Sequence, residues 1–172
     1  IMRSINTTVE FVSKVIDEFE NEIELQELII SEFDESGRIT LQNIFLDENL
    51  KILQSILLYK YDINGNIIEI ITLDRNKKPV YKINYCYNEQ VLLEKKECFD
   101  LITNVEDSKE IFKYDNQKRL IEIYDIVTKT KKTYEYEAKG QVKRIFIFSD
   151  NSSEFIKALS YTYNDLNDVD SV

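Results

Sequence analysis

One turn-forming motif recurs along the chain and constrains its fold more than any other feature. The motif has an aromatic residue, an Asp, Asn or Glu, two or three polar residues, a Gly or its substitute, one further residue and an aliphatic residue. All three glycines of the chain occupy the same motif position. Six aromatic anchors span 130 residues in five intervals of about 26, a spacing that indicates an internal repeat; they are Phe33, Tyr61, Tyr87, Tyr114, Tyr136 and Tyr163.

The motif predicts the tip of a β-hairpin. An Asp that opens a turn accepts backbone N–H groups with its side chain, and a glycine adopts the left-handed backbone of a G1 bulge. In the fourth copy Lys118 must adopt that backbone at some cost, and the third copy, 86–91, is one residue shorter, so we expect a two-residue turn there. The predicted turn residues are Gly37, Asp62, Gly65, Asp115, Gly140 and Asn167.

The segments on both sides of each motif have the composition of β-strands. Aromatic residues precede the tips at period two, as at Tyr59 and Tyr61, and aliphatic segments such as 67–73 and 142–148 follow them. Asp residues mark return turns at the opposite edge, and Pro79 falls in one of these turns. The sequence therefore predicts a mainly β fold, an antiparallel β-meander of about six tandem hairpin repeats with about 11 strands.

The first thirty residues carry a different pattern. Thr7 and Glu10 have capping-box spacing, and Val9, Val12, Ile16 and Phe19 follow at helical intervals. We expect one N-terminal α-helix over 7–22 that covers the apolar face or the first edge of a repeat sheet over 24–172. Together they are expected to form a single domain over 1–172.

The predicted register of the hairpins points to a binding face. Pairing Asp62 with Asn66 places Tyr61 opposite Ile67 and Tyr59 opposite Glu69. The same rule places Tyr85 near Glu94, Phe112 near Glu122 and Tyr134 near Arg144. Tyrosine is enriched at protein interfaces, so this face is predicted to bind a protein partner. The candidate partner-binding residues are Tyr59, Glu69, Tyr85, Glu94, Glu122 and Tyr134; the alternative is that these rings pack beneath the helix or against neighbouring strands.

The charge of the chain favours a basic partner. Asp and Glu number 32 and Lys and Arg 22, which gives a net charge of −10. Such a surface repels phosphate backbones, so no nucleic-acid partner is expected, and the lysines around Lys131 are interpreted as guards of an edge strand. The longest apolar runs are about four residues, against roughly 20 for a membrane span, so no membrane association is expected. If Met2 is the start, the protein is cytoplasmic; the alternative is a leader removed before Ile1.

The residue types available argue against catalysis. The chain has no histidine, phosphate-binding loop or nucleophile elbow. Cys86 and Cys98 lack metal-site spacing and are expected to be reduced thiols. We therefore predict a protein without enzymatic activity, cofactor or metal; an enzyme that uses carboxylates alone is the weaker alternative.

The motif at Tyr61, Asp62, Gly65 and Ile67 resembles the YD repeat of Rhs and wall-associated proteins, and the resemblance covers residues 25–169. It implies long, coiled antiparallel sheets, which in that family sometimes enclose a toxin, and it implies no catalytic residues. The chain departs from the family pattern, since only the copies at Tyr61 and Tyr114 keep Tyr-Asp and six repeats are too few to enclose a toxin. The resemblance and the acidity together favour a bacterial immunity protein that binds and neutralises a cognate toxin with a basic domain. The alternative is a structural YD-repeat module of a surface or secreted protein without a toxin partner.

Overall fold

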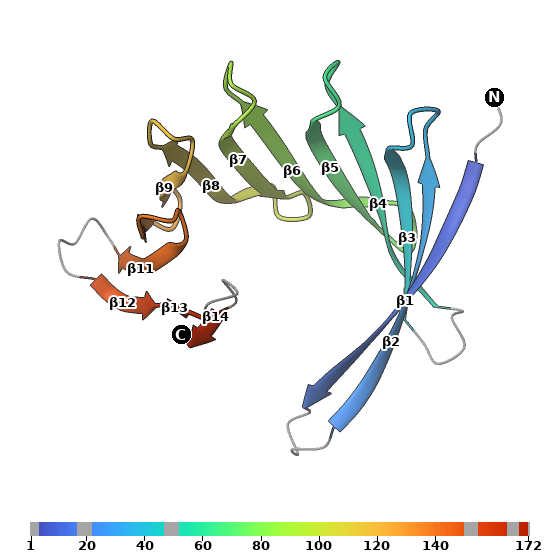
Figure 1. Cartoon of the computed structure of the whole chain (residues 1–172). Helices are drawn as coiled ribbons and strands as arrows, with labels where there is room; N and C mark the ends of the chain where they lie inside the picture. The colour runs from blue at the N-terminus through green and yellow to red at the C-terminus, as the bar shows by residue number, and fades with distance from the viewer. Residues whose placement is uncertain (1–3, 17–21, 47–51, 150–154, 165–168, 172) are drawn as a thin grey trace. The chain divides into compact units, whose positions relative to one another are not determined.

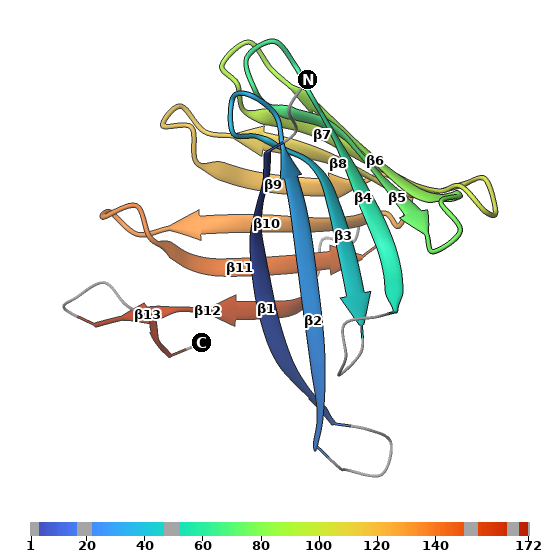
Figure 2. The same cartoon turned by 90° about the vertical axis from the view of Figure 1, so that its right-hand side faces the viewer.

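The computed structural model describes residues 4–16, 22–46, 52–149, 155–164 and 169–171, which form strands and turns (Figures 1 and 2). The strands are β1 (Ser4–Ile16), β2 (Glu22–Phe33), β3 (Ile39–Leu46), β4 (Leu53–Tyr61), β5 (Ile67–Asp74), β6 (Pro79–Tyr87), β7 (Leu93–Asp100), β8 (Val105–Tyr114), β9 (Leu120–Asp125), β10 (Thr130–Tyr136), β11 (Val142–Ser149), β12 (Phe155–Ser160), β13 (Thr162–Tyr163) and β14 (Val169–Ser171).

The strands follow one another in the order of the chain. A 12-stranded sheet has the order β1 to β12, and β13 pairs with β14 in a separate two-stranded sheet. The strand pairs within each half of the chain are antiparallel. The predicted antiparallel meander is confirmed, and its eleven strands correspond to β2–β12.

Two compact units divide the chain. The first contains Ile1–Asn84 and Phe99–Val105, and the second contains Tyr85–Cys98 and Glu106–Val172. In the first unit β2 to β5 are successive hydrogen-bonded neighbours, and in the second β8 to β12 are. Each unit is therefore built from hairpins that contact the preceding and the following hairpin.

The predicted helix over 7–22 is not confirmed, and a long hairpin stands in its place. Residues 4–16 form β1, which pairs with β2 from Ser4 opposite Phe33 to Ile16 opposite Glu22; residues 17–21 lie outside the described part. Valine, isoleucine and threonine favour extended backbone over helix, and the segment around Val9, Phe11 and Val12 is rich in such residues. Strand pairing also satisfies the backbone groups of β2, which a helix would leave with one free edge.

The hairpin tips share one backbone geometry. At the second tip the amide of Asp62 donates to the carbonyl of Asn66 (2.9 Å) and the amide of Gly65 donates to the carbonyl of Asp62 (3.2 Å). The Asp62 carboxylate accepts the amides of Asn64 and Asn66 at 2.9 and 2.8 Å. Gly65 has φ +90°, and Gly37 and Gly140 have φ +77° and +89°. These values lie in the left-handed region that glycine adopts without steric cost. Asn167, the predicted equivalent in the last copy, lies outside the described residues.

The third tip is not the shortened, two-residue turn that the sequence suggested. Asn88 makes the same bonds as Asp62, to Leu92 and Val91 through the backbone (2.9 Å each) and to the amides of Gln90 and Leu92 through its side chain. Val91 occupies the glycine position with φ +61°. The copy therefore has full length, and a β-branched residue holds a left-handed backbone that it adopts only at a steric cost.

The predicted register is wrong at several pairs, because each of these hairpins has a bulge next to its tip. Tyr61 lies opposite Ile67 as predicted, but Tyr59 lies opposite Ile70, because the ladder shifts by one residue between Lys60 and Tyr61. Phe112 is likewise opposite Ile123 and not Glu122, and Tyr134 is opposite Ile145 and not Arg144. A bulge sets two residues of one strand against one of its partner, and the predicted pairing omitted this extra residue.

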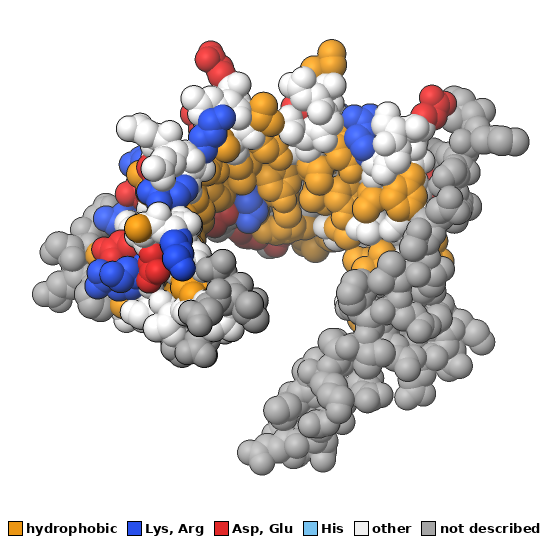
Figure 3. All heavy atoms as spheres, viewed as in Figure 1, with side chains coloured by type: hydrophobic (Ala, Val, Ile, Leu, Met, Phe, Trp, Pro, Cys, Tyr) orange, Lys and Arg blue, Asp and Glu red, His pale blue; other side chains and the backbone are white. Residues whose placement is uncertain are grey.

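The described residues have few buried side chains. Among the residues whose burial is known, only Ile56, Cys98, Ser31 and Asp125 are buried. Figure 3 shows hydrophobic side chains exposed over β3–β5 and charged side chains near the hairpin tips. Cys86 and Cys98 are free thiols. Few described side chains are therefore fully buried, and neighbouring strands within each unit supply the contacts.

Candidate protein-binding surface

Four of the motif tyrosines form a hydrogen bond to the preceding hairpin. The hydroxyl of Tyr61 donates to the carbonyl of Ile39 (2.7 Å), and that of Tyr114 donates to the carbonyl of Leu93 (2.9 Å). The same bond joins Tyr136 to Leu120 (2.6 Å) and Tyr163 to Val142 (2.7 Å). Every acceptor is the residue six positions after the preceding anchor. Ile39, Leu120 and Val142 each pair with that anchor, between the turn and the register shift. This repeated bond fixes the spacing of successive tips and hence the shape of the surface between them.

Two arginines strengthen these junctions. The Arg38 guanidinium lies 4.9 Å from the centre of the Tyr61 ring, and that of Arg119 lies 4.7 Å from the Tyr136 ring. Each arginine also pairs at 2.7 Å with the Asp that opens its own turn, Asp34 or Asp115. An arginine one position after the glycine site thus links a turn carboxylate to the anchor ring of the next repeat.

The turn carboxylates are stabilised in their charged form. The pKa of Asp115 is lowered first by the backbone amide of Arg119 and then by the Arg119 side chain and the amide of Gln117, against the opposing effect of burial. The pKa of Asp62 is lowered chiefly by the Asn66 side chain and by backbone amides. Backbone donors therefore hold these carboxylates ionised because each one closes a turn.

Three of the six predicted binding residues, Tyr59, Glu69 and Glu122, form hydrogen bonds or ion pairs with other residues of the chain. The Tyr59 hydroxyl donates to Gln42 Oε1. Lys60 Nζ lies 3.5 Å from Glu69, and Lys113 Nζ lies 2.7 Å from Glu122. Because these carboxylates face lysines across the strand, the predicted face of alternating tyrosines and acids does not form at these hairpins.

Two predicted tyrosines in the second unit are influenced by the same ion-paired carboxylate. Lys96 Nζ lies 3.0 Å from Glu110 Oε2. The Glu110 charge acts on both Tyr85 and Tyr134, although burial is the larger cause of the raised pKa of each phenol. Burial lowers the pKa of Lys96, but the hydrogen bond to Glu110 and the nearby negative charge together raise it above its ordinary value. Tyr85 and Tyr134 therefore lie beside a paired charge and keep neutral hydroxyls at neutral pH.

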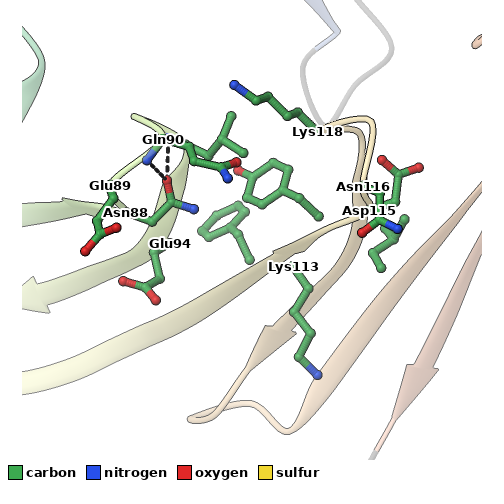
Figure 4. A pocket seen from close by; sticks show the side chains of 12 residues that line it. Asn88, Glu89, Gln90, Glu94, Lys113, Asp115, Asn116 and Lys118 are labelled. Carbon is green, nitrogen blue, oxygen red and sulfur yellow. Dashed lines mark hydrogen bonds between the residues drawn. The ribbon is translucent and has the colours of Figure 1, made fainter.

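The sixth predicted residue, Glu94, is exposed and lines the larger of two hollows in the second unit. This hollow, called the inter-tip groove below, has a volume of about 760 Å³ and lies between the turns at 88–92 and 115–119. In Figure 4, Asn88, Glu89, Gln90 and Glu94 come from one side and Lys113, Asp115, Asn116 and Lys118 from the other. Leu92, Phe112, Tyr114 and Ile121 add an apolar and aromatic lining. An aromatic wall with a polar rim suits a protein side chain.

A smaller hollow of about 290 Å³ lies near the return turn after β9 and includes Glu110, Asp125 and Lys132 in its lining. Burial opposes ionisation of Asp125, but the amides of Lys109, Val127 and Thr128 outweigh burial and lower its pKa. Its oxygen thereby closes the return turn and joins it to β8. The carboxylate therefore has a structural role in this hollow.

The pairing of an arginine with the next anchor tyrosine, which occurs at two junctions, was not predicted from the sequence. Its signal was present, since Arg38 and Arg119 occupy the same motif position. The groove was missed because the third copy was aligned one residue short, which hid Leu92 at the arginine position. Within the described ranges the structure shows no group of three metal-ligating side chains and no helix of the length and hydrophobicity that a membrane crossing requires.

Comparisons with known proteins give only distant structural similarities. No family model and no curated protein matches the chain. The solved structure of TcdB2-TccC3 without its hypervariable C-terminal region is similar with a TM-score of 0.37 and 13% identity, over 84% of this chain and 9% of that chain. The Photorhabdus luminescens Tc holotoxin pore gives a TM-score of 0.34 and 12% identity, over 89% of this chain. The present chain spans only 10% of the latter's length, and at these TM-scores the similarities assign neither a family nor a function.

Proposed function

We propose that this chain is a non-catalytic protein-binding module, and specifically a bacterial immunity protein that binds and neutralises a basic toxin domain. The distribution of charge carries the proposal. Residues 15–48 contain eleven Asp or Glu residues and one Arg, whereas the remainder of the chain has 21 acidic and 21 basic residues. The whole net charge of −10 therefore belongs to one continuous segment, which includes all of β2 and β3. A concentrated field of one sign speeds association with an oppositely charged protein.

The open construction of the sheet supports a binding role. Only four residues of known burial are buried, and the described part of the chain offers exposed strand faces and the inter-tip groove. The repeats are proposed to be YD-type hairpins that act as a rigid scaffold for these surfaces. The proposal places the protein in the cytoplasm without cofactor, metal, nucleic acid or membrane.

The proposal is tested with the toxin domain encoded beside the gene. Two properties are measured: whether the chain protects cells from this domain, and whether it binds the domain. Co-expression with the chain is expected to relieve growth arrest, and affinity is expected to fall steadily as salt rises from 50 to 500 mM. The triple variant Glu22→Gln, Glu24→Gln, Glu27→Gln is expected to flatten the salt dependence. The matched variant Glu106→Gln, Asp107→Asn, Glu137→Gln removes the same charge elsewhere and is expected to leave it unchanged. Absence of protection and binding would overturn the proposal.

The bonding between repeats favours a second candidate, a structural YD-repeat module of a surface or secreted protein. Four tyrosine bonds each join a hairpin to the preceding one, as in an array that can be extended by further repeats. Further repeats in the full gene, together with a leader sequence and no adjacent toxin gene, would favour this function over immunity.

A further inference from the structure

Two of the five junctions contain an arginine just after the glycine site, and the other three have Asn66, Leu92 or Gln141 at that position. At the junctions built on Tyr61 and Tyr136, the residue just after the glycine site is Arg38 or Arg119, and its guanidinium stacks on the ring. At the junction built on Tyr114 that residue is Leu92. Among the described side chains no Lys or Arg stacks on the Tyr114 ring. The inter-tip groove opens at this junction, and both Leu92 and Tyr114 line it.

The pKa values of the anchor phenols also reflect whether an arginine lies beside the ring. The pKa of Tyr61 and that of Tyr136 are raised by burial and partly lowered again by the neighbouring arginine. The pKa of Tyr114 is raised by burial alone. The ring of Tyr114 therefore presents its surface without the cation that the two equivalent rings have.

The charges around the groove complement a cation. Lys113 is paired with Glu122, and Asp115 is paired with Arg119. This leaves Glu89, Glu94 and Lys118 as the lining charges that form no ion pair with described residues, two negative against one positive. Glu89 and Glu94 can therefore take the part that Asp34 and Asp115 play toward the internal arginines.

We propose that the inter-tip groove binds an arginine side chain of the protein partner, with its guanidinium stacked on Tyr114 and paired with Glu89 or Glu94. This inference rests on the proposed protein-binding function and specifies which side chain the partner presents. We choose arginine because the chain itself stacks a planar guanidinium on the anchor ring at two junctions, Arg38 on Tyr61 and Arg119 on Tyr136. Guanidinium stacks on aromatic faces and pairs with carboxylates, whereas an ammonium acts as a compact point charge.

The probe is the blocked peptide Ala-Ala-Arg-Ala-Ala, compared with the same peptide carrying citrulline or lysine. Titrations of the ¹⁵N-labelled chain are expected to shift the amides of 88–94 and 113–118. The citrulline peptide, which keeps the planar shape without the charge, is expected to bind about fivefold more weakly. The lysine peptide is expected to fall between the two. Equal binding of the arginine and citrulline peptides would overturn the proposal, as would shifts confined to other segments.

Two variants assign the binding to the groove. Leu92→Arg restores the internal arginine and is expected to weaken peptide binding more than tenfold, whereas Val127→Arg adds the same charge at the opposite end of β9 and is expected to leave it unchanged. Glu94→Gln removes one lining carboxylate without adding bulk and is expected to weaken binding about threefold. Unchanged binding to Glu94→Gln and to a folded Leu92→Arg would refute the assignment. Chemical shifts of 88–94 that change on dilution of the free chain would instead identify a second copy as the occupant and also overturn it.

The groove assignment and the proposed immunity function can fail independently of each other. A toxin domain that binds Leu92→Arg as tightly as the unaltered chain would overturn the groove assignment and leave the immunity function standing. Arginine-dependent peptide binding without toxin protection would support the groove and overturn the immunity function.

Discussion

The hydroxyl of Tyr136 donates a 2.6 Å hydrogen bond to the carbonyl oxygen of Leu120, which lies in the preceding hairpin. Leu120 pairs with Tyr114 in the ladder, where the register shifts after the turn. The tyrosine therefore holds the carbonyl at the point where strand pairing is irregular. The recurrence of this bond at Tyr61, Tyr114 and Tyr163 makes it the main specific link between repeats.

Tyr136→Phe is expected to lower the free energy of unfolding by about 1 kcal/mol, because it removes one hydrogen bond and keeps the ring. Urea denaturation measures the change. Tyr134→Phe is the matched control on the same strand, since the Tyr134 hydroxyl makes no hydrogen bond to the described residues. An equal loss in both variants would show that the bond to Leu120 contributes nothing specific.

Val91→Gly is expected to raise the free energy of unfolding by about 1 kcal/mol, because it relieves the cost of a β-branched residue at φ +61°. Gly65→Val makes the reverse change at an equivalent site and is expected to destabilise the chain by a similar amount or more. Thermal and urea unfolding check both. Destabilisation by Val91→Gly would mean that the valine side chain contributes more than the backbone costs.

Asp115→Asn is expected to reduce the loss of stability in acid. The folded-state pKa of Asp115 is depressed, so its contribution is present above the unfolded-state pKa of about 3.9 and is lost as the pH falls through the lower, folded-state pKa. Asn88 shows that an amide can close the same turn. Acid titration followed by circular dichroism should show a shallower transition below about pH 4 for the variant. Identical acid transitions in the two proteins would contradict the role of Asp115.

Lys113→Glu is expected to destabilise the β8–β9 hairpin by about 0.5 kcal/mol, because it places two carboxylates opposite one another. The double variant Lys113→Glu, Glu122→Lys reverses the pair and is expected to recover most of the loss. Denaturation of the single and double variants in low salt provides the measurement. Additive losses in the double variant would argue against direct pairing of these residues.

The turns were predictable from the sequence because their chemistry is local. Asp62 and Gly65 bond within five residues, so their spacing alone indicates the turn and the strands on both sides of it. The cross-strand partners were not predictable from the same counting. One extra bulge residue moves every pair beyond it, and this is why Tyr59 faces Ile70 and why Glu69 faces Lys60.

The first strand and the inter-tip groove were not predicted, because both depend on residues that are far apart in the sequence. The spacing of Val9, Val12 and Ile16 fits one face of a helix, but these residues also suit a strand, and pairing with β2 decides between the two. Leu92 lines the groove and stands at the position that Arg38 and Arg119 occupy in two other copies. Its detection required the correct length of the third turn, which became visible only through the backbone of Val91.

The tyrosine bonds have a consequence for how a chain of this kind changes in length. The hydroxyls of Tyr61, Tyr114, Tyr136 and Tyr163 each donate to a backbone carbonyl of the preceding hairpin, an acceptor that every amino acid provides. Duplication or deletion of one whole unit between equivalent bulges would therefore reproduce the same junction without compensating substitutions elsewhere. Such a protein can be lengthened or shortened in steps of about 26 residues while the individual side chains between the tips diverge.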